Sequence, residues 1–317
     1  MSSITPQKTL DITIVGETNL DLILYGLPEE LELERELLGS GFKITLGGSS
    51  SILAHNLAIL GTRVGFLSEV GDDEMADIAL DRLSESGLDL SHIARRKGAT
   101  TGVTLLLPHG KKRHILTYPG VMSQLSVVDL DMDYLTSSRH FHLSSLFLQT
   151  GLHRGLPQLF DDLKAKGLTI SLDTNDDPAD QWGGILEEVL DKIDILLPNE
   201  EELKKIAGTT STEEALEKLS SRVKLIVVKC GSRGAIVQQG NQRDWVAPVQ
   251  VEAIDTIGAG DSFNAGFLSA YLQCLSPITA AAMGNITGAL STQCPGGTEA
   301  YRDKRLRDAF FDRHKLR

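Results

Sequence analysis

Short runs of aliphatic and β-branched residues alternate with amphipathic segments along this chain, and this alternation constrains the fold more than any other feature. The runs at 12–15, 64–67, 169–172, 193–197 and 225–228 are typical of buried strands. Helical patterns separate most of them, which predicts crossover connections around a mainly parallel central sheet flanked by helices. Because ligands of such α/β sheets bind beyond the carboxyl ends of the strands, we expect the functional site at that edge.

Two stretches, 20–46 and 100–118, interrupt the alternation. In the second stretch, strand-like runs at 103–107 and 114–117 flank a short turn, as in a β-hairpin. We expect both stretches to form a small antiparallel β lid on the main sheet. No linker rich in Pro, Gly or Ser separates them from the rest of the sequence, so we predict one domain over residues 1–317.

Composition and charge exclude several classes of protein. The chain has 317 residues, of which 41% are hydrophobic, enough for a large packed core. A formal net charge of -12 argues against binding to nucleic acid or to an anionic membrane surface. The absence of a signal-peptide or membrane-span pattern favours a cytoplasmic location. The three cysteines have no CxxC spacing, so we expect reduced thiols, with Cys230 and Cys274 as small buried hydrophobes.

One segment carries candidate chemistry. Gly258, Ala259 and Gly260 stand directly before a helical pattern that starts at Asp261. A glycine turn that opens a helix favours anions, because its N–H groups converge at the positive end of the helix dipole. An aspartate in the first turn could accept a proton from a hydroxyl held beside a phosphate. The competing interpretation, a tight turn with Asp261 as an ordinary helix N-cap, fits the local spacing equally well.

The sequence Asp255-Thr-Ile-Gly-Ala-Gly-Asp-Ser-Phe-Asn-Ala-Gly-Phe267 closely resembles the C-terminal signature of the ribokinase-like, or phosphofructokinase B, carbohydrate kinase family. Rival phosphate motifs do not fit, because the sequence has no GxxxxGK[ST] loop and no protein-kinase signature. Further matches follow in family order: Gly16-Glu-Thr-Asn-Leu-Asp21, Gly47-Gly48, Asp173-Thr-Asn175, Asn199-Glu-Glu-Glu202 and Lys229-Cys-Gly-Ser-Arg-Gly234. The resemblance covers nearly the whole chain and implies a ribokinase-like fold and ATP-dependent phosphorylation of a small molecule.

The resemblance assigns roles around the phosphates of ATP. It implies that Asp261 activates the substrate hydroxyl, while the N–H groups of Gly258, Ala259 and Gly260 form an anion hole. Asn199 and Glu202 match the family motif that organises Mg²⁺ and phosphate, largely through water. Taken by residue type alone, the run 199–202 is more typical of an ordinary helix start with acidic residues favoured by the helix dipole.

The resemblance also assigns a nucleotide-binding turn. Lys229, Gly231 and Gly234 follow the strand predicted at 225–228, and Gly231 would allow the backbone to approach ATP closely. The alternative is a plain turn between strands. Asn285 lies where family members place a residue near the adenine, although a helical asparagine can equally be a structural polar group.

On the substrate side, Asn19 and Asp21 follow the first strand, and Asp21 matches the aspartate that binds sugar hydroxyls in the family. The alternative is a capped turn after the strand. Gly47, Gly48 and Asp173 complete the substrate residues implied by the resemblance. Ile52 stands where sugar kinases of the family usually carry a substrate-binding asparagine, which weakens assignment as a ribokinase or fructokinase. Asn56 supplies an amide one helical turn later, as a substrate ligand or as a structural residue.

Three further features are weaker indications. Asp255 and Ile257 match the loop that binds a monovalent cation in the K⁺-activated members of the family. The basic hairpin tip at 109–114 could contact an anionic group of a substrate, but a solvated turn is the simpler interpretation. His142, Ser145 and Gln149 are candidates for the lining of the substrate side.

The sequence therefore predicts a Mg²⁺- and ATP-dependent kinase that transfers a phosphoryl group to a hydroxyl of a sugar or sugar-like molecule. Nucleoside and phosphosugar kinases share the scaffold, so both remain alternatives. A sensor that binds a sugar or nucleotide without turnover is a more remote one, since fold and chemistry can separate. The apolar strands of the lid also suggest a homodimer formed through the lid.

Overall fold

A computed structural model describes residues 8–109 and 112–315. Its main sheet has nine strands in these residues, in the order β13-β12-β11-β10-β9-β8-β1-β4-β5. The strands from β11 to β5 pair in parallel, whereas β12 and β13 add an antiparallel edge. The bounds are β1 (Ile12–Val15), β4 (Val64–Val70), β5 (Ile93–Arg95), β8 (His140–Ser144), β9 (Thr169–Asp173), β10 (Ile195–Leu196), β11 (Leu225–Lys229), β12 (Ala235–Gln239) and β13 (Gln242–Val246).

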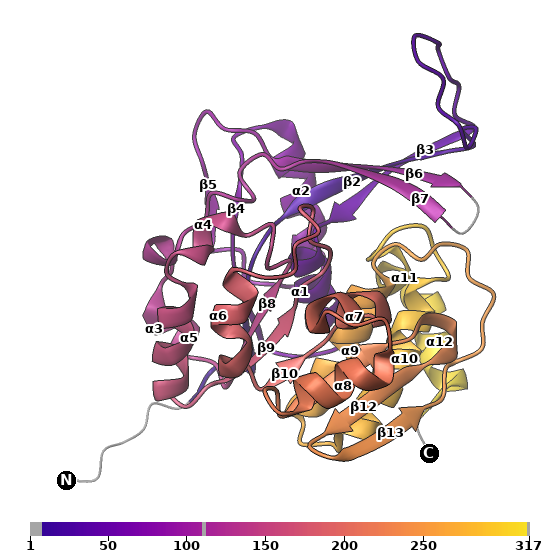
Figure 1. Cartoon of the computed structure of the whole chain (residues 1–317). Coiled ribbons are helices and arrows are strands. Elements are labelled where there is room, and N and C mark those ends of the chain that lie inside the picture. The colour runs from indigo at the N-terminus through magenta and orange to yellow at the C-terminus, as the bar shows by residue number, and fades with distance from the viewer. Residues whose placement is uncertain (1–7, 110–111, 316–317) are drawn as a thin grey trace.

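Helices cover both faces of this sheet (Figure 1). One face packs against α3 (Met132–Thr136), α5 (Leu156–Ala165), α6 (Ile185–Val189), α7 (Glu200–Ala207) and α8 (Thr212–Ser220). The other face packs against α1 (Ser49–Ile59), α2 (Glu74–Ser84), α9 (Ala259–Leu272) and α10 (Pro277–Ser291). The short α4 (Thr150–His153) precedes α5, and α11 (Glu299–Arg302) and α12 (Lys304–Arg313) end the described chain.

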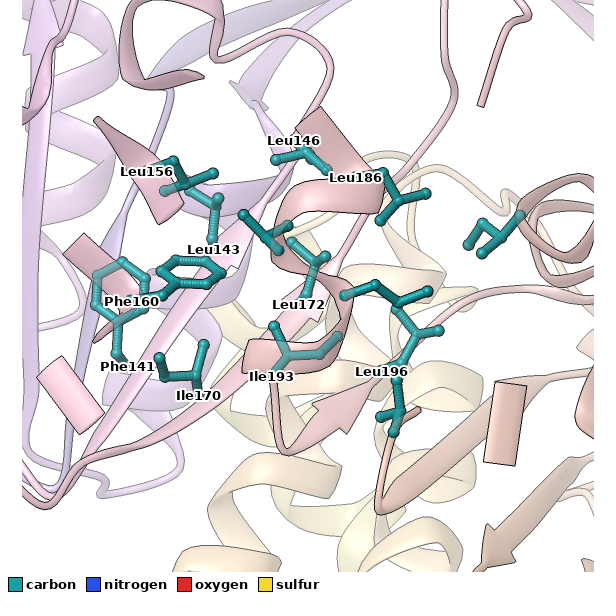
Figure 2. Packing of buried hydrophobic residues seen from close by; sticks show 14 of the residues in the cluster. Phe141, Leu143, Leu146, Leu156, Phe160, Ile170, Leu172, Leu186, Ile193 and Leu196 are labelled. Atoms are coloured by element: carbon teal, nitrogen blue, oxygen red, sulfur yellow. The ribbon is translucent and has the colours of Figure 1, made fainter. Parts of the chain in front are cut away.

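The two-residue period of the strands explains why both faces of the sheet are apolar. Phe141 and Leu143 of β8 point to the face that carries α5, where they pack with Leu156 and Phe160 (Figure 2). Each of these side chains is fully buried, and burial of one such side chain contributes about 1.5 to 3 kcal/mol to folding. Neighbouring positions of the sheet face the opposite layer, so one sheet supports two helical layers.

A second, four-stranded sheet forms the lid, in the order β3-β2-β6-β7. Its strands are β2 (Asn19–Tyr25), β3 (Gly41–Gly47), β6 (Gly102–His109) and β7 (Lys112–Tyr118). The pairs β2–β3 and β6–β7 are antiparallel, and β2 pairs with β6 in parallel. In Figure 1 the lid extends from the sheet over the side of the molecule that carries α11. The predicted segments 20–46 and 100–118 therefore lie side by side in one sheet.

The observed elements differ from the predicted ones in a few places. The strand expected at 193–197 is reduced to Ile195–Leu196. Cys230 is buried as predicted, but Cys274 is exposed, because α9 ends before it and Cys274 adopts a positive φ of 64°. His142 points into the sheet layers, where its ring nitrogens bond with the hydroxyls of Ser171 and Ser144. No helix within residues 8–109 and 112–315 is long and apolar enough to cross a membrane.

Candidate active site

The N-terminus of α9 presents Asp261. The helix begins at Ala259, and its N-cap is Gly258, whose φ of +69° lies in the left-handed region that favours glycine. A Cβ at Gly258 would lie 2.4 Å from the Cα of Gly297, so this turn requires glycine. Asp261 stands inside the first turn, and its carboxylate accepts a hydrogen bond from the hydroxyl of Ser49 at the start of α1. The alternative interpretation of Asp261 as the helix N-cap is therefore wrong.

Asp261 has the environment of a general base. Burial raises the pKa of its carboxyl to about 6, and the negative charge of Asp173 adds to the rise. The hydrogen bond from Ser49 and the positive charge of Lys229 act in the opposite direction. A carboxyl with a pKa near 6 is ionised at neutral pH and is more basic than an ordinary aspartate, which suits a group that accepts a proton.

We expect kcat/KM to fall below about pH 6, because protonated Asp261 cannot accept a proton. Replacing Ser49 with alanine removes a hydrogen bond that stabilises the carboxylate of Asp261. The pKa of Asp261 should therefore rise, and the acidic limb of the plot of kcat/KM against pH should move to higher pH. Ser51→Ala is a matched control, because Ser51 donates to the carbonyl of Gly47. An acidic limb that stays in place or moves to lower pH in Ser49→Ala would contradict the assignment of the limb to Asp261.

A buried ion pair lies behind the glycine turn. Lys229, the last residue of β11, contacts Asp173 at the end of β9. Asp173 is fully buried and also accepts a hydrogen bond from Asn264 of α9. Burial opposes the charge on Lys229, but Asp173 and Glu202 more than compensate and raise its pKa. Asp173, predicted as a substrate residue, therefore already has two donors within the protein.

A cavity of about 260 Å³ lies between α9, α10 and the turn after β11. The predicted nucleotide residues Lys229, Gly231, Gly234 and Asn285 line it, together with Ala259, Gly260 and Phe263. Pro248, Val249 and Val251 add the apolar surface that a ligand ring requires. The glycine turn and an apolar pocket thus share one cavity, which fits a nucleotide with its phosphates at the start of α9.

Asn285 lies in the wall of this cavity as a structural group. Its Nδ2 donates to the backbone carbonyls of Val246 (3.2 Å) and Ala247 (2.9 Å), and the residue is 9% exposed. These bonds hold α10 against the chain that follows β13. Asn285 therefore shapes the cavity with an amide nitrogen that is already satisfied.

Asn199 and Glu202 form a capping box at the start of α7. The side chain of Asn199 accepts from the N–H of Glu202 (2.9 Å), and the Glu202 carboxylate accepts from the N–H of Asn199 (2.8 Å). Burial, followed by the charge of Asp173, raises the pKa of Glu202 to about 7. The helix-start interpretation of this segment is therefore correct. Asn199 also forms an isolated β-bridge with Lys229, and this bridge brings Glu202 close to Lys229.

Asn19 and Asp21 lie on β2 of the lid, against Gly47 and Gly48. A Cβ at Gly47 would lie 2.2 Å from Oδ1 of Asp21, and one at Gly48 would lie 2.5 Å from Oδ1 of Asn19. Only glycine therefore lets this turn approach the two side chains. Nδ2 of Asn19 donates to the hydroxyl of Thr104 (3.0 Å), while its Oδ1 has no partner among the described residues. The lid thus presents hydrogen-bond acceptors, which suits a ligand rich in hydroxyl donors.

Glu17 is a residue of this site that the sequence reasoning missed. It follows β1 and is buried, and its carboxylate accepts bonds from the hydroxyls of Ser50 (2.8 Å) and Ser145 (2.8 Å) and from Nε2 of Gln149 (2.7 Å). Burial raises its pKa. Oε1 of Gln149 has no partner in the part of the chain that is described. Glu17 lies inside the opening motif, but its residue type gave no sign of burial.

Two residues of α1 contact other parts of the protein. Asn56 is fully buried and donates to the hydroxyl of Ser262 (3.0 Å) and to the carbonyl of Gly297 (3.1 Å). These bonds connect α1 to α9 and favour the structural alternative for Asn56, whose role as a substrate residue stays a prediction. Ile52 is 2% exposed and packs against Gly297 and Gly258. Ile52 therefore packs against the glycine turn and fills the space beside it.

The segment of the predicted monovalent-cation site is also tied to the lid. The carboxylate of Asp255 accepts the N–H groups of Ile257 (3.0 Å) and Gly296 (3.2 Å). Ile257 is buried and packs against Ile23 and Leu106 of the lid. Among the described residues, no group of three or more His, Cys, Asp or Glu side chains is arranged to hold a metal ion. The cation role of Asp255 and Ile257 stays a prediction.

Comparison with known proteins identifies the family. The family model described as pfkB family carbohydrate kinase matches residues 9–304. The chain belongs to this family. This pfkB kinase is 28% identical over 294 residues to the 2-dehydro-3-deoxygluconokinase of Bacillus subtilis, covering 87% of this chain and 91% of that protein. It is 27% identical over 267 residues to the cytidine kinase of Thermococcus kodakarensis, covering 83% of this chain and 88% of that protein.

A solved structure shares the fold of this pfkB kinase. The ribokinase of Arabidopsis thaliana, complexed with ribose and ATP, superposes with a TM-score of 0.79 at 21% identity and covers 97% of this chain and 99% of that one. The predicted α/β fold with a mainly parallel sheet and a small β lid is confirmed. Membership in the pfkB family makes the protein a sugar or nucleoside kinase.

Proposed function

We propose that this pfkB kinase transfers the γ-phosphoryl group of ATP to a hydroxyl of a neutral sugar or sugar-like polyol, with Asp261 as the general base. The observation that carries the proposal is the position of Asp261. Its partly buried carboxylate, with a pKa near 6, belongs to the helix turn whose Ala259 and Gly260 line the nucleotide cavity, and it lies close enough to Asp21 for its charge to raise the pKa of that residue. A hydroxyl held there faces both a proton acceptor and the site of the transferred phosphate.

The residues around Asp261 supply the remaining requirements of phosphoryl transfer. The N–H groups of Gly258 and Gly260, at the start of α9, would stabilise the negative charge of the transferred phosphoryl group. Lys229 lines the same cavity as a cation. Mg²⁺, when bound with ATP, supplies further charge neutralisation. Glu202, with its partner Asn199, would hold this ion through water.

A neutral polyol is favoured over a phosphosugar by the charges of the acceptor side. Glu17 and Asp21 are buried there and Asp261 is partly buried, and among the described residues Oδ1 of Asn19 and Oε1 of Gln149 are acceptors without a partner. Burial and the charge of Asp261 raise the pKa of Asp21 to about 8, so its carboxyl is largely protonated at neutral pH and can donate to a hydroxyl. These groups pair with hydroxyls, and the ionised carboxyl of Asp261 disfavours a second phosphate close to it.

The test is a screen of purified protein with ATP and Mg²⁺ against aldoses, ketoses, nucleosides and phosphosugars, with ADP release as the readout. We expect the highest kcat/KM among neutral polyols. A preference for phosphosugars would refute the proposed acceptor class and leave the kinase assignment intact. ATP binding without turnover on any acceptor would instead support the sensor alternative.

We further propose that two copies associate through the outer face of the lid. Phe42, Leu116 and Tyr118 alternate onto this face and are 60%, 53% and 56% exposed, an apolar surface that a second copy would cover. Sedimentation at micromolar concentration is expected to give a dimer, and Leu116→Asp should shift it to monomer. Val128→Asp, at a position that is 92% exposed and outside the lid, is the control and should leave the dimer unchanged. A wild-type monomer would refute the dimer.

A further inference from the structure

The helix α1 begins without a cap of its own. Its N-cap is Gly48, which has no side chain to accept the free N–H groups, and its first turn contains no acidic residue. The structure requires this glycine, because a Cβ at residue 48 would lie 2.5 Å from Oδ1 of Asn19 and 3.1 Å from Cγ of Glu17. The N–H groups at the start of α1 therefore depend on an acceptor from elsewhere in the chain.

Glu17, which follows β1, supplies this acceptor. Its Oε1 accepts from the backbone N–H of Ser50 (3.3 Å), the second residue of α1, and its Oε2 accepts from the Ser50 hydroxyl (2.8 Å). A helix cap normally accepts from this N–H group or the next one. A negative charge at this end of a helix is also favoured by the helix dipole. Glu17 thus caps α1 from another part of the fold.

The carboxylate of Glu17 is anchored on its other side by the segments that follow β8 and β9. The Ser145 hydroxyl (2.8 Å) and Nε2 of Gln149 (2.7 Å) donate to it, and Nδ2 of Asn175 donates to the Ser145 hydroxyl (2.8 Å). Ser145 and Asn175 have positive φ values of 55° and 51°, which residues other than glycine rarely adopt. Burial raises the pKa of Glu17, while the bonds from Ser50 and Ser145 act in the opposite direction.

The first turn of α1 matters because it also carries Ser49. The hydroxyl of Ser49 donates to the carboxylate of Asp261 on α9. Ser49 and Ser50 are the first two residues of α1, so the turn that Glu17 holds is the turn that directs the Ser49 hydroxyl. A series of contacts therefore connects Glu17 to the proposed general base.

Glu17 acts on Asp261 through its charge as well, and this effect has the opposite sign. The negative charge of Glu17 raises the pKa of Asp261, whereas the hydrogen bond from Ser49 lowers it and is the larger of the two effects. The other charged groups near Asp261, which remain in place in every Glu17 variant, are Asp21, Asp173 and Lys229. The direction in which the pKa of Asp261 moves can therefore separate the two effects.

We propose that Glu17 is a positioning residue of the reaction, which caps α1 and thereby keeps the Ser49 hydroxyl on the carboxylate of Asp261. The consequence for catalysis rests on the proposed function, since it requires Asp261 as the general base. The contact between Ser49 and Asp261 itself needs no turnover, so it can be measured in the resting protein.

The test follows the Asp261 carboxyl by ¹³C NMR against pH in wild-type protein, Ser49→Ala, Glu17→Gln and the double variant. The resonance is assigned by its absence in Asp261→Asn. Glu17→Gln should raise the titration midpoint by about 0.5 to 1 pH unit, because an amide N–H group opposite the donors releases the turn and the bond from Ser49 is lost. In the Ser49→Ala protein this bond is already absent. Glu17→Gln should therefore lower the midpoint there, through the lost charge alone.

Ser50→Ala is a second variant, which keeps the charge of Glu17 and removes the hydroxyl contact to it. It should raise the midpoint by less than Glu17→Gln does, and it should have no effect in the Ser49→Ala protein. Glu69→Gln is the matched control, because Glu69 is a buried carboxylate that pairs with Arg96 instead of α1. Its midpoint should equal that of the wild type. Thermal melting checks that each variant is folded, and Ser50→Ala decides the question if Glu17→Gln does not fold.

Two results would overturn the proposal. A lower midpoint for Glu17→Gln in both backgrounds would mean that Glu17 acts by charge alone. Unchanged midpoints in Glu17→Gln and Ser50→Ala would mean that the cap does not control Ser49. Failure of the proposed function is distinguishable, because the acidic limb of kcat/KM should follow the NMR midpoint in every variant. A limb that does not follow it would remove Asp261 as the general base and leave the positioning of Ser49 by Glu17 intact.

Discussion

Replacing Asp261 with asparagine is expected to lower kcat by about 10²- to 10⁴-fold, because the amide keeps the size of the side chain but cannot accept the proton of the substrate hydroxyl. The affinity for ATP should survive, since the nucleotide cavity and the glycine turn are unchanged. The Ser49 hydroxyl can still donate to the amide oxygen of the new residue. The loss should therefore lie in kcat, measured on the best acceptor of the screen.

Asp303→Asn is the matched control for this variant. Asp303 caps α12 by accepting from the N–H of Leu306 (3.0 Å), and Asn caps a helix about as well as Asp. Its kcat should equal that of the wild type. Calorimetry with ATP and thermal melting exclude misfolding of Asp261→Asn. A kcat within about tenfold of the wild type would remove Asp261 from the role of general base.

Replacing Lys229 with methionine is expected to reduce the free energy of unfolding by about 3 to 5 kcal/mol, because Asp173 would be left as an unpaired charge in the interior. The side chain of Lys229 is 11% exposed and that of Asp173 is fully buried. Asn264 would remain as a donor to Asp173, but a neutral amide does not replace an ammonium. Chemical denaturation followed by circular dichroism measures the change.

The double variant Lys229→Met, Asp173→Asn separates the lost ion pair from lost packing. It removes both charges, and the amide at 173 can still accept from Asn264, so most of the stability should return. Activity should remain low in both variants, because Lys229 lines the nucleotide cavity. A Lys229→Met variant as stable as the wild type would show that the ion pair with Asp173 does not stabilise the folded protein.

The sequence predicted the parts of this protein that depend on local pattern. Aliphatic runs predicted the long strands, because a strand buried on both faces must be apolar throughout. The strand prediction failed in part at 193–197, because only Ile195 and Leu196 pair with neighbouring strands. The other apolar side chains of this run are buried without belonging to a strand. Gly258 was recognisable because a glycine turn before a helix has a backbone requirement that the sequence displays directly.

The roles of single polar residues were less predictable, because tertiary contacts decide them. Asn56 has the residue type of a ligand, yet a partner more than 200 positions away, Ser262, occupies its amide. Glu17 is an ordinary glutamate in the sequence, and only the convergence of Ser145 and Gln149 on it makes it a buried carboxylate.

The most direct test of the central claim is mass spectrometry of the acceptor after incubation with wild-type protein, ATP and Mg²⁺. The proposed function predicts that the best neutral polyol gains one phosphoryl group in amounts equal to the ADP released, and that the Asp261→Asn variant forms almost none. ADP release without a phosphorylated acceptor, or equal product from the Asp261→Asn variant, would contradict transfer to a hydroxyl activated by Asp261.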